Sequence, residues 1–225
     1  MTEAATLTCP KTTRVLIIDD HPAVREGLLY RLGRVAHLEV CGEADDAASA
    51  LELVSQTLPD LVIVDISLKS GNGIDLVKRI KLLDDSIRIL VWSMHPDSIY
   101  AERAIRAGAQ GYINKEQATD KMVEAIAQVL AGRIYLSEPM ANKILQLAAG
   151  GRQMLEQSPV ERLSDRELEA FRLLGQGLDS HQVAMQMHIT SRTVDTYRAR
   201  IKTKLKCQTG RQLVQCAIQW VLETA

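Results

Sequence analysis

The chain has 225 residues and a net charge of −1, with 46% hydrophobic and 24% charged residues, which is ordinary for a globular protein of two modest domains. No apolar stretch is as long as a bilayer span, and residues 1–13 lack the apolar segment of a signal peptide, so we expect a cytoplasmic protein with no membrane partner. The segment from Ser158 to the end of the sequence has ten Lys or Arg and seven Asp or Glu, and therefore a net charge of +3. The rest of the chain has a net charge of −4. A basic binding module joined to an acidic regulatory module would show this asymmetry.

Between residues 14 and 132, short β-rich runs alternate with segments of helical periodicity. Pro22 suits the first position of a helix, and Pro59 closes another. Repeated strand–helix units predict an α/β domain, in which helices cover both faces of a five-stranded parallel sheet. The predicted strands are Val15–Asp19, Glu39–Glu43, Leu61–Asp65, Ile89–Ser93 and Gly111–Asn114.

The pattern changes after residue 132. We interpret residues 133–159 as a linker with one helix that begins near Ser137, and residues 160–225 as an all-α module of four short helices. Ser164 and Glu167 form a capping box at the start of the first of these helices. The four predicted helices run from Ser164 to Gly175, Ser180 to His188, Ser191 to Lys206 and Thr209 to Leu222.

Four cysteines, Cys9, Cys41, Cys207 and Cys216, are scattered along the chain without the spacing of a zinc site. The chain is also too large to need disulfides for its stability. We therefore expect reduced thiols that serve as small apolar side chains and carry no functional weight.

Polar side chains follow the predicted strands. Asp19 and Asp20 come at the end of the first strand, and Asp65 at the end of the third. If these strands are parallel neighbours, the three carboxylates collect at one edge of the sheet, where they can bind a divalent cation and offer one oxygen as a nucleophile. Ser93 can add a hydroxyl and Lys115 an ammonium group. Singly, these residues suit turns, helix caps and solvated surfaces, but together they favour phosphoryl transfer to Asp65.

Several motifs of this half stand at the same predicted strand ends: Val15-Leu16-Ile17-Ile18-Asp19-Asp20-His21-Pro22, Val64-Asp65 with Gly73, Trp92-Ser93, and Tyr112-Ile113-Asn114-Lys115. With them the chain resembles, over roughly residues 14–132, the receiver domain of bacterial two-component response regulators. The resemblance implies a flavodoxin-like fold, phosphorylation of Asp65 by a sensor histidine kinase, and Mg²⁺ bound by Asp19, Asp20 and Asp65. It also implies that Ser93 and Tyr112 couple phosphorylation to a change of the domain surface.

One place departs from this family's pattern. Leu68-Lys69 stand where the family usually has a Met-Pro pair. Without the proline the loop beside the acceptor should be looser, and Lys69 adds a charge that assists or disturbs the entry of phosphate. The departure affects the expected lifetime of the phosphorylated state, not the identity of the acceptor.

The predicted helix Ser191–Lys206 carries six basic residues and one acid, Asp195. On one face of this helix, the central side chains are small and polar, and basic side chains surround them. Such a face suits the major groove of DNA. A solvated amphipathic helix would explain the charges equally well. The preceding segment from Gly177 to Ala184 predicts a turn and a short helix, which makes a helix-turn-helix with Ser191–Lys206 as the recognition helix. The apolar stripe of the recognition helix is Val194, Tyr197, Ile201 and Leu205.

Further motifs of the C-terminal module are Leu163-Ser164-Asp165-Arg166-Glu167, Gly177, Val183-Ala184, Thr193-Val194 and Lys204-Leu205. They resemble the LuxR-type DNA-binding domain over roughly residues 160–224, so that the whole chain looks like a response regulator of the NarL/FixJ type. The resemblance implies that Asp195, Thr196 and Ala199 face the bases, where lysine is common at the first and last position. An acid can accept a hydrogen bond from cytosine but cannot pair with guanine O6 and N7, which predicts an altered target sequence. The predicted DNA contacts are Arg192, Thr193, Asp195, Thr196, Tyr197, Arg198, Ala199, Arg200, Lys202 and Lys204.

These features together predict a phosphorylation-controlled transcription regulator of promoter DNA. Phosphorylation either frees the recognition helix from the receiver or promotes a homodimer whose two recognition helices reach half-sites one helical turn apart. RNA polymerase is a further candidate partner. The last helix offers an apolar stripe that suits either a dimer contact or the core of one subunit, and its candidate dimer residues are Leu213, Val214, Ala217 and Trp220.

Two other functions use the same residues. A phosphatase or hydrolase would employ Asp65 as its nucleophile, but Ser67 stands where its general acid is needed. A phosphorylation-independent DNA-binding regulator would use the N-terminal half only as a dimerisation platform, an alternative that Leu68-Lys69 keeps open. We expect no enzymatic activity beyond Mg²⁺-dependent self-phosphorylation and dephosphorylation.

Overall fold

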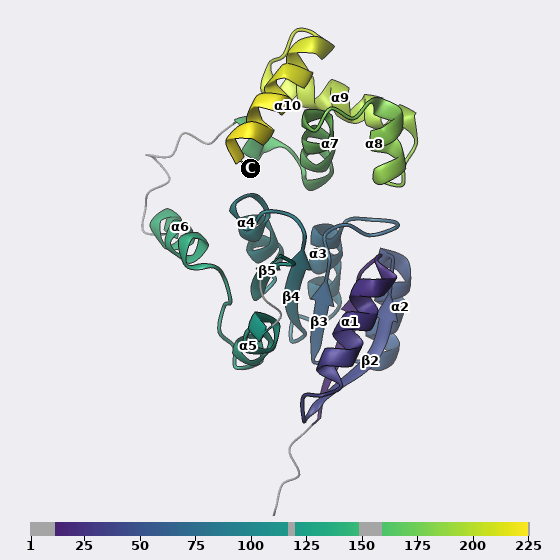
Figure 1. Ribbon diagram of the computed structural model, residues 1–225, viewed down its shortest axis with the longest axis vertical. Coiled ribbons are helices and arrows are strands. Elements are labelled where there is room, and N and C mark those ends of the chain that lie inside the picture. The colour runs from purple at the N-terminus through teal and green to yellow at the C-terminus, as the bar shows by residue number, and fades with distance from the viewer. Residues whose placement is uncertain (1–11, 117–119, 149–158, 225) are drawn as a thin grey trace, which may run out of the picture.

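The apolar runs of the N-terminal half form a parallel sheet. In the computed structural model, which describes residues 12–116, 120–148 and 159–224, five strands lie in the order β2-β1-β3-β4-β5, and all neighbouring strands are parallel (Figure 1). This confirms the predicted flavodoxin-like class. The strands are β1 (Thr13–Ile18), β2 (Leu38–Ala44), β3 (Leu61–Val64), β4 (Arg88–Ser93) and β5 (Gly111–Asn114).

Helices cover both faces of this sheet, as the βα pattern predicts. Val15 and Ile17 pack with one group of helices, whereas Leu16 and Ile18 point to the opposite face, because successive side chains of a strand alternate. Both faces are therefore buried, which explains why the central strands are unbroken apolar runs. The helices of this half are α1 (Pro22–Leu32), α2 (Ala47–Thr57), α3 (Gly73–Leu83), α4 (Asp97–Ala107) and α5 (Asp120–Leu130).

The described residues of the C-terminal module form helices joined by short turns, and side-chain caps fix helix starts. Ser164 and Glu167 form the predicted capping box, and Asp179 with Gln182 forms a second one. The helix after Asp179 ends at Gln186, two residues before the predicted end, since His188 adopts a positive φ of 52°. The elements are η2 (Pro159–Arg162), α7 (Asp165–Gly175), α8 (Ser180–Gln186), α9 (Ser191–Leu205) and α10 (Gly210–Thr224).

The two halves lie against each other. Figure 1 shows the C-terminal module at the end of the sheet domain where α3 and α4 lie, with α6 (Glu138–Ala148) to one side. The remainder of the predicted linker, residues 149–158, lies outside the described residues, as does Cys9. In the described part of the chain, no helix is both long and apolar enough to cross a membrane.

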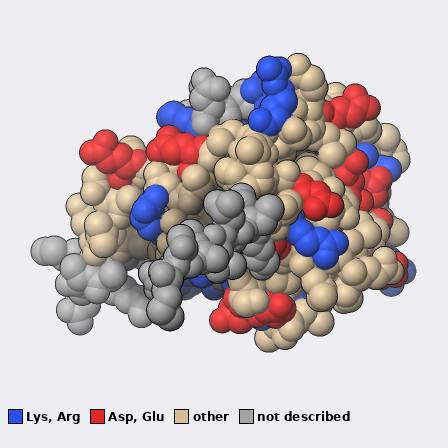
Figure 2. Space-filling model, turned by 90° about the horizontal axis from the view of Figure 1, so that it is seen from below, with Lys and Arg blue, Asp and Glu red and all other residues tan. Residues whose placement is uncertain are grey.

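On the face of the molecule that is viewed from below, acidic and basic side chains are interspersed among uncharged ones (Figure 2). A surface of this kind carries no large field of one sign.

Candidate phosphoacceptor pocket and DNA-binding helix

Strand register brings the predicted acidic residues together. Ile18 of β1 pairs with Val64 of β3, so that the residues that follow, Asp19 and Asp65, leave the sheet side by side. Both side chains are buried, with exposed fractions of 2% and 3%. The carboxylates therefore share one water-poor pocket at the carboxyl edge of the sheet, where α/β folds place their ligand sites.

Lys115 provides the cation of this pocket. Ser93 at the end of β4 pairs with Asn114 of β5, and Lys115 follows directly. Its Nζ atom donates hydrogen bonds to Asp19 Oδ2 at 2.5 Å and to Asp65 Oδ2 at 2.6 Å. One ammonium group thus bridges two buried carboxylates from different strands, which offsets part of the cost of burying these charges.

Asp20 and His21 complete the acidic group. A ligand atom from each of Asp19, Asp20, His21 and Asp65 lies within 4.8 Å of the others, which is close enough for one metal ion. The buried Oδ1 of Asp20 lies 2.6 Å from Nδ1 of the exposed His21. Carboxylate oxygens are the ligands that hard cations prefer, and three carboxylates converge here, so the residues present fit a magnesium-type ion.

The backbone around Asp65 is closely packed. Asp65 Oδ1 accepts a hydrogen bond of 2.6 Å from the amide of Ile66, and burial raises the pKa of the carboxyl group, against the opposing effect of Lys115. A Cβ atom on Gly73 would lie 1.9 Å from the carbonyl oxygen of Asp65, so no larger residue fits there. This contact gives a physical reason for the glycine in the motif.

The loop after β4 connects this pocket to its surroundings through His95. The backbone carbonyl of His95 accepts a 2.7 Å hydrogen bond from the hydroxyl of Tyr112, and its ring nitrogen lies 3.0 Å from Ser67 Oγ. The ring also stacks on Tyr100 of α4 at a centroid distance of 4.7 Å. Burial, together with the charges of Arg172 and Lys115, lowers the pKa of His95 to about 3. The imidazole is therefore neutral at physiological pH, and the sequence pattern did not single it out.

The unusual Leu68-Lys69 pair does not leave the acceptor loop unsupported. Leu68 is buried with an exposed fraction of 3%, and Lys69 Nζ donates to Asp45 Oδ2 at 2.6 Å. The backbone amide of Lys69 also bonds to the carbonyl of Asp45. The lysine charge is thus paired with Asp45, and these contacts hold the loop in the absence of the proline.

The predicted recognition helix is α9, and its outward face is open to solvent. Val194 and Ile201 of the predicted apolar stripe are fully buried, while Tyr197 and Leu205 are half-buried against the core. The opposite face carries the exposed side chains of Arg192, Asp195, Thr196, Ala199 and Arg200.

Other predicted DNA contacts of α9 are engaged within the module. Arg198 donates to Ser180 Oγ at 2.7 Å, and Lys204 bonds to Glu167 Oε2 at 2.5 Å. Thr193 and Lys202 are half-buried. Arg198 and Lys204 therefore connect α9 to the rest of its domain and are less available for DNA than the exposed face.

The candidate dimer residues of α10 lie mainly inside one subunit, which favours the core alternative for this stripe. Leu213 and Ala217 have no exposed surface, Val214 is half-buried, and Trp220 packs against Phe171 with ring centroids 5.6 Å apart. The stripe is apolar because it closes the core of its own module. The outward apolar residues of α10 are Ile218 and Leu222, with exposed fractions of 40% and 76%.

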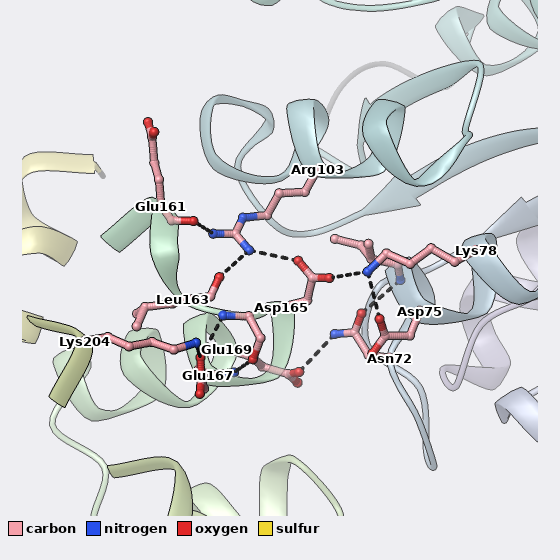
Figure 3. A network of polar contacts seen from close by, with 12 residues as sticks. Asn72, Asp75, Lys78, Arg103, Glu161, Leu163, Asp165, Glu167, Glu169 and Lys204 are labelled. Carbon is pink, nitrogen blue, oxygen red and sulfur yellow. Dashed lines mark hydrogen bonds and ion pairs between the residues drawn. The ribbon is translucent and has the colours of Figure 1, made fainter. Parts of the chain in front are cut away.

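A contact between the two halves was not foreseen from the sequence (Figure 3). Asp165 of α7 accepts from Arg103 of α4 at 2.9 Å and from Lys78 of α3 at 3.0 Å. Glu169, one turn further along α7, accepts a 3.2 Å hydrogen bond from the buried Asn72, in the loop that follows Asp65. We refer to these pairings as the interdomain contact.

More hydrogen bonds from the α4 side reinforce this contact. Arg103 also donates to the backbone carbonyls of Leu163 at 2.8 Å and Glu161 at 3.3 Å. Arg166 of α7 donates to the carbonyl of Gly71. The charge of Arg172, also on α7, affects the pKa of both His95 and Tyr100. Helix α7 therefore contacts the loop that follows Asp65, and the charge of its Arg172 acts on His95 in the loop after β4.

Known protein families match both halves of the chain. The response regulator receiver domain matches residues 15–127, and the luxR family of bacterial regulatory proteins matches residues 161–217. The chain belongs to the response regulators that carry a LuxR-type DNA-binding domain. The first half of this response regulator is thus its receiver and the second its DNA-binding domain, as the sequence motifs indicate.

Individual relatives extend over nearly all of this response regulator. The transcriptional activator protein ExaE of Pseudomonas putida is 32% identical over 205 residues, which cover 91% of this chain and 95% of that protein. A two-component response regulator of the LuxR family from Aurantimonas sp. is 37% identical, with a TM-score of 0.57, and covers 62% of this chain and 99% of that one. RcsB from Salmonella enterica, bound to the promoter rprA, has a TM-score of 0.61 at 24% identity, covers 91% of this chain and 98% of that one, and supports the fold alone.

Proposed function

We propose that this response regulator controls transcription through phosphorylation of Asp65. The observation that carries the proposal is the bridge from Lys115 to Asp19 and Asp65, at 2.5 and 2.6 Å, in a buried pocket. A carboxylate that accepts a phosphoryl group needs positioning and neutralisation of charge more than covalent help. Lys115 provides a fixed cation, and the neighbouring carboxylates can hold a second one.

The proposed transfer uses a phosphohistidine of a sensor kinase as donor. An oxygen of Asp65 attacks the phosphorus atom while the bond from phosphorus to the kinase imidazole breaks, and the imidazole leaves with the bonding electrons. Lys115 then pairs with the acyl phosphate, and the hydroxyl of Ser93 lies on the same side of the sheet edge. Asp65 is the proposed acceptor because it bonds to Lys115 at 2.6 Å and shares the possible metal site with Asp19 and Asp20.

Mg²⁺ is the metal that we propose for the acidic group. Asp19, Asp20 and Asp65 would hold it through carboxylate oxygens, with His21 at the rim. When bound, the ion supplies positive charge to the incoming phosphoryl group. Asp19 would then share its charge between Lys115 and the metal.

The interdomain contact offers a path from the acceptor to the DNA-binding domain. Phosphorylation adds negative charge beside Ser93, and the loops on either side of the pocket carry Asn72 and His95. Helix α7 contacts the first loop through Glu169, and the charge of its Arg172 contributes to lowering the pKa of His95 in the second loop. A change in either loop therefore alters the surface on which α7 rests.

Docking of the two domains does not bury the base-facing side of α9. Asp195, Thr196 and Ala199 remain exposed while α7 is held by the receiver. This favours control by dimerisation, in which release of α7 lets two recognition helices reach adjacent half-sites of a promoter. The exposed apolar pair Ile218 and Leu222 is the part of α10 that could contribute to such a homodimer.

The decisive experiment is intact-mass measurement after incubation with Mg²⁺ and acetyl phosphate. We expect one phosphate adduct on the native chain and none on Asp65→Asn. Absence of an adduct on both, with DNA binding unaffected by Asp65→Asn, would support the platform alternative. Continuous release of phosphate from an ester substrate would instead support a phosphatase.

Specificity of the proposed DNA contact is tested separately at Asp195. This side chain is exposed and lies 3.3 Å from Ser180 Oγ. We expect Asp195→Lys to change the base that is preferred at one position when binding sites are selected from random DNA. The free-energy difference between the preferred base and the others at that position should be about 1–3 kcal/mol. The matched control is Lys206→Asp, at the exposed C-terminal cap of α9, which should weaken binding without changing the preferred bases. An unchanged preference in Asp195→Lys would refute its role in reading bases.

A further inference from the structure

Two cysteines that are separated in the sequence meet in the DNA-binding domain. Cys207 follows the C-terminal cap of α9, and Cys216 lies on α10. Their Sγ atoms are 4.0 Å apart, which is ordinary contact between two reduced sulfur atoms. Both are free thiols, and the fold brings them together although nine positions separate them in the sequence.

The surroundings of the pair keep it accessible and hold its backbone in place. Cys216 is exposed and Cys207 is half-buried, so that reagents in solution can reach the former. Lys206 adopts a positive φ of 56° at the helix cap, and the amide of Cys207 bonds to the carbonyl of Lys202. This cap fixes the direction in which the Cys207 side chain leaves α9.

We propose that Cys207 and Cys216 form a reversible dithiol–disulfide site, which joins the end of the recognition helix to α10. A disulfide bond brings the two sulfur atoms to about 2.05 Å, so the side chains must approach by about 2 Å. The turn that follows the cap and the first turns of α10 lie within the ten-residue loop that such a bond would close. Oxidation would thus restrain the turn that carries the end of α9.

The oxidant in this proposal is a small disulfide such as oxidised glutathione. The thiolate of the exposed Cys216 attacks one sulfur of that disulfide, forms a mixed disulfide and releases one molecule of the small thiol. The thiolate of Cys207 then attacks Cys216 Sγ and displaces the second small thiol. The protein has lost two protons and two electrons, and the small disulfide has been reduced to two thiols.

The experiment uses the full chain with Cys9→Ser and Cys41→Ser, so that the pair is the remaining source of thiols. The protein is equilibrated with mixtures of oxidised and reduced glutathione, free thiols are alkylated, and the intact mass is measured. We expect a monomer that lacks two hydrogen atoms and takes up no alkyl group. The chains that also carry Cys207→Ser or Cys216→Ser serve as matched controls, and should form mixed disulfides instead.

Because closure within one molecule is favoured by proximity, the internal disulfide should form at least about tenfold more readily than either mixed disulfide. Amide exchange of residues 206–216 should also be slower in the oxidised chain. The proposal would be overturned by a chain in which glutathione stays attached to Cys216 while Cys207 remains a free thiol. A disulfide between two chains, or unchanged exchange in the oxidised chain, would also overturn it.

Discussion

Two clusters of cations and carboxylates in this response regulator are built from the same groups but differ in burial. In the acceptor pocket, Lys115, Asp19 and Asp65 have side-chain exposures of 5%, 2% and 3%. In the interdomain contact, Asp165 is 11% exposed, but its partners Arg103 and Lys78 are 19% and 49% exposed. The first cluster lies on a single sheet, whereas the second joins two domains.

This difference indicates different tasks. Charges that are buried on a rigid sheet interact strongly and cannot easily separate, so the pocket is organised in advance, as the proposed phosphoryl transfer requires. Ion pairs that remain partly hydrated contribute less, because water replaces the partner when the pair opens. The interdomain contact is therefore suited to a reversible change.

The largest effect is expected at Lys115. Lys115→Ala leaves Asp19 and Asp65 without their shared cation, and the rate of phosphorylation by acetyl phosphate should fall by about 100-fold. The initial rate is measured by intact mass, and a thermal unfolding curve shows whether the variant is folded. Lys121→Ala, at an exposed position of α5, is the matched control. A near-native rate in Lys115→Ala would mean that the bridge is not needed for the transfer.

A smaller effect is expected at Arg103, which donates to Asp165 and to two backbone carbonyls of the DNA-binding domain. Arg103→Ala should weaken docking by about 1.5–3 kcal/mol, since hydrogen bonds to charged groups are lost while Asp165 stays close to Lys78. Faster amide hydrogen exchange in α7 would report this loss. Arg106→Ala removes an ion pair within α4, to Glu102, and should leave exchange in α7 unchanged. Equal exchange in both variants would exclude Arg103 as a determinant of docking.

The smallest effect concerns Glu169. Burial raises the pKa of its carboxyl group above the ordinary value of 4.5, although the charge of Arg166 and the hydrogen bond from Asn72 act to lower it. A raised pKa in the docked state means that docking favours the protonated acid and is weakened as the pH rises through that pKa. Glu169→Gln mimics the protonated form and should strengthen docking by about 1 kcal/mol at neutral pH. The pH dependence of exchange in α7 tests this, because native and variant chains should converge below about pH 4.5. A difference that persists in acid would assign the effect to packing instead.

Much of the fold and pocket could be predicted, since local patterns specify them. The predicted strand Gly111–Asn114 matches β5, and Glu39–Glu43 lies within β2, one residue short at each end. Asp19 and Asp65 follow their strands directly, so parallel pairing alone brings them together. The apolar stripe of α10 was harder to interpret, because Leu213 would look the same in a core as in a dimer contact.

The sequence by itself determined the order of strands and helices, the group of acceptor residues and the polar face of the recognition helix. Each of these follows from the spacing of apolar side chains, which repeats every two residues in a strand and every 3.6 residues in a helix, or from the type of residue at the end of an element. Tertiary structure decided the rest: Asn72 meets Glu169 across 97 positions, and Cys207 meets Cys216. Such contacts depend on how whole surfaces pack, and packing energy is distributed over many side chains, so no local pattern records it.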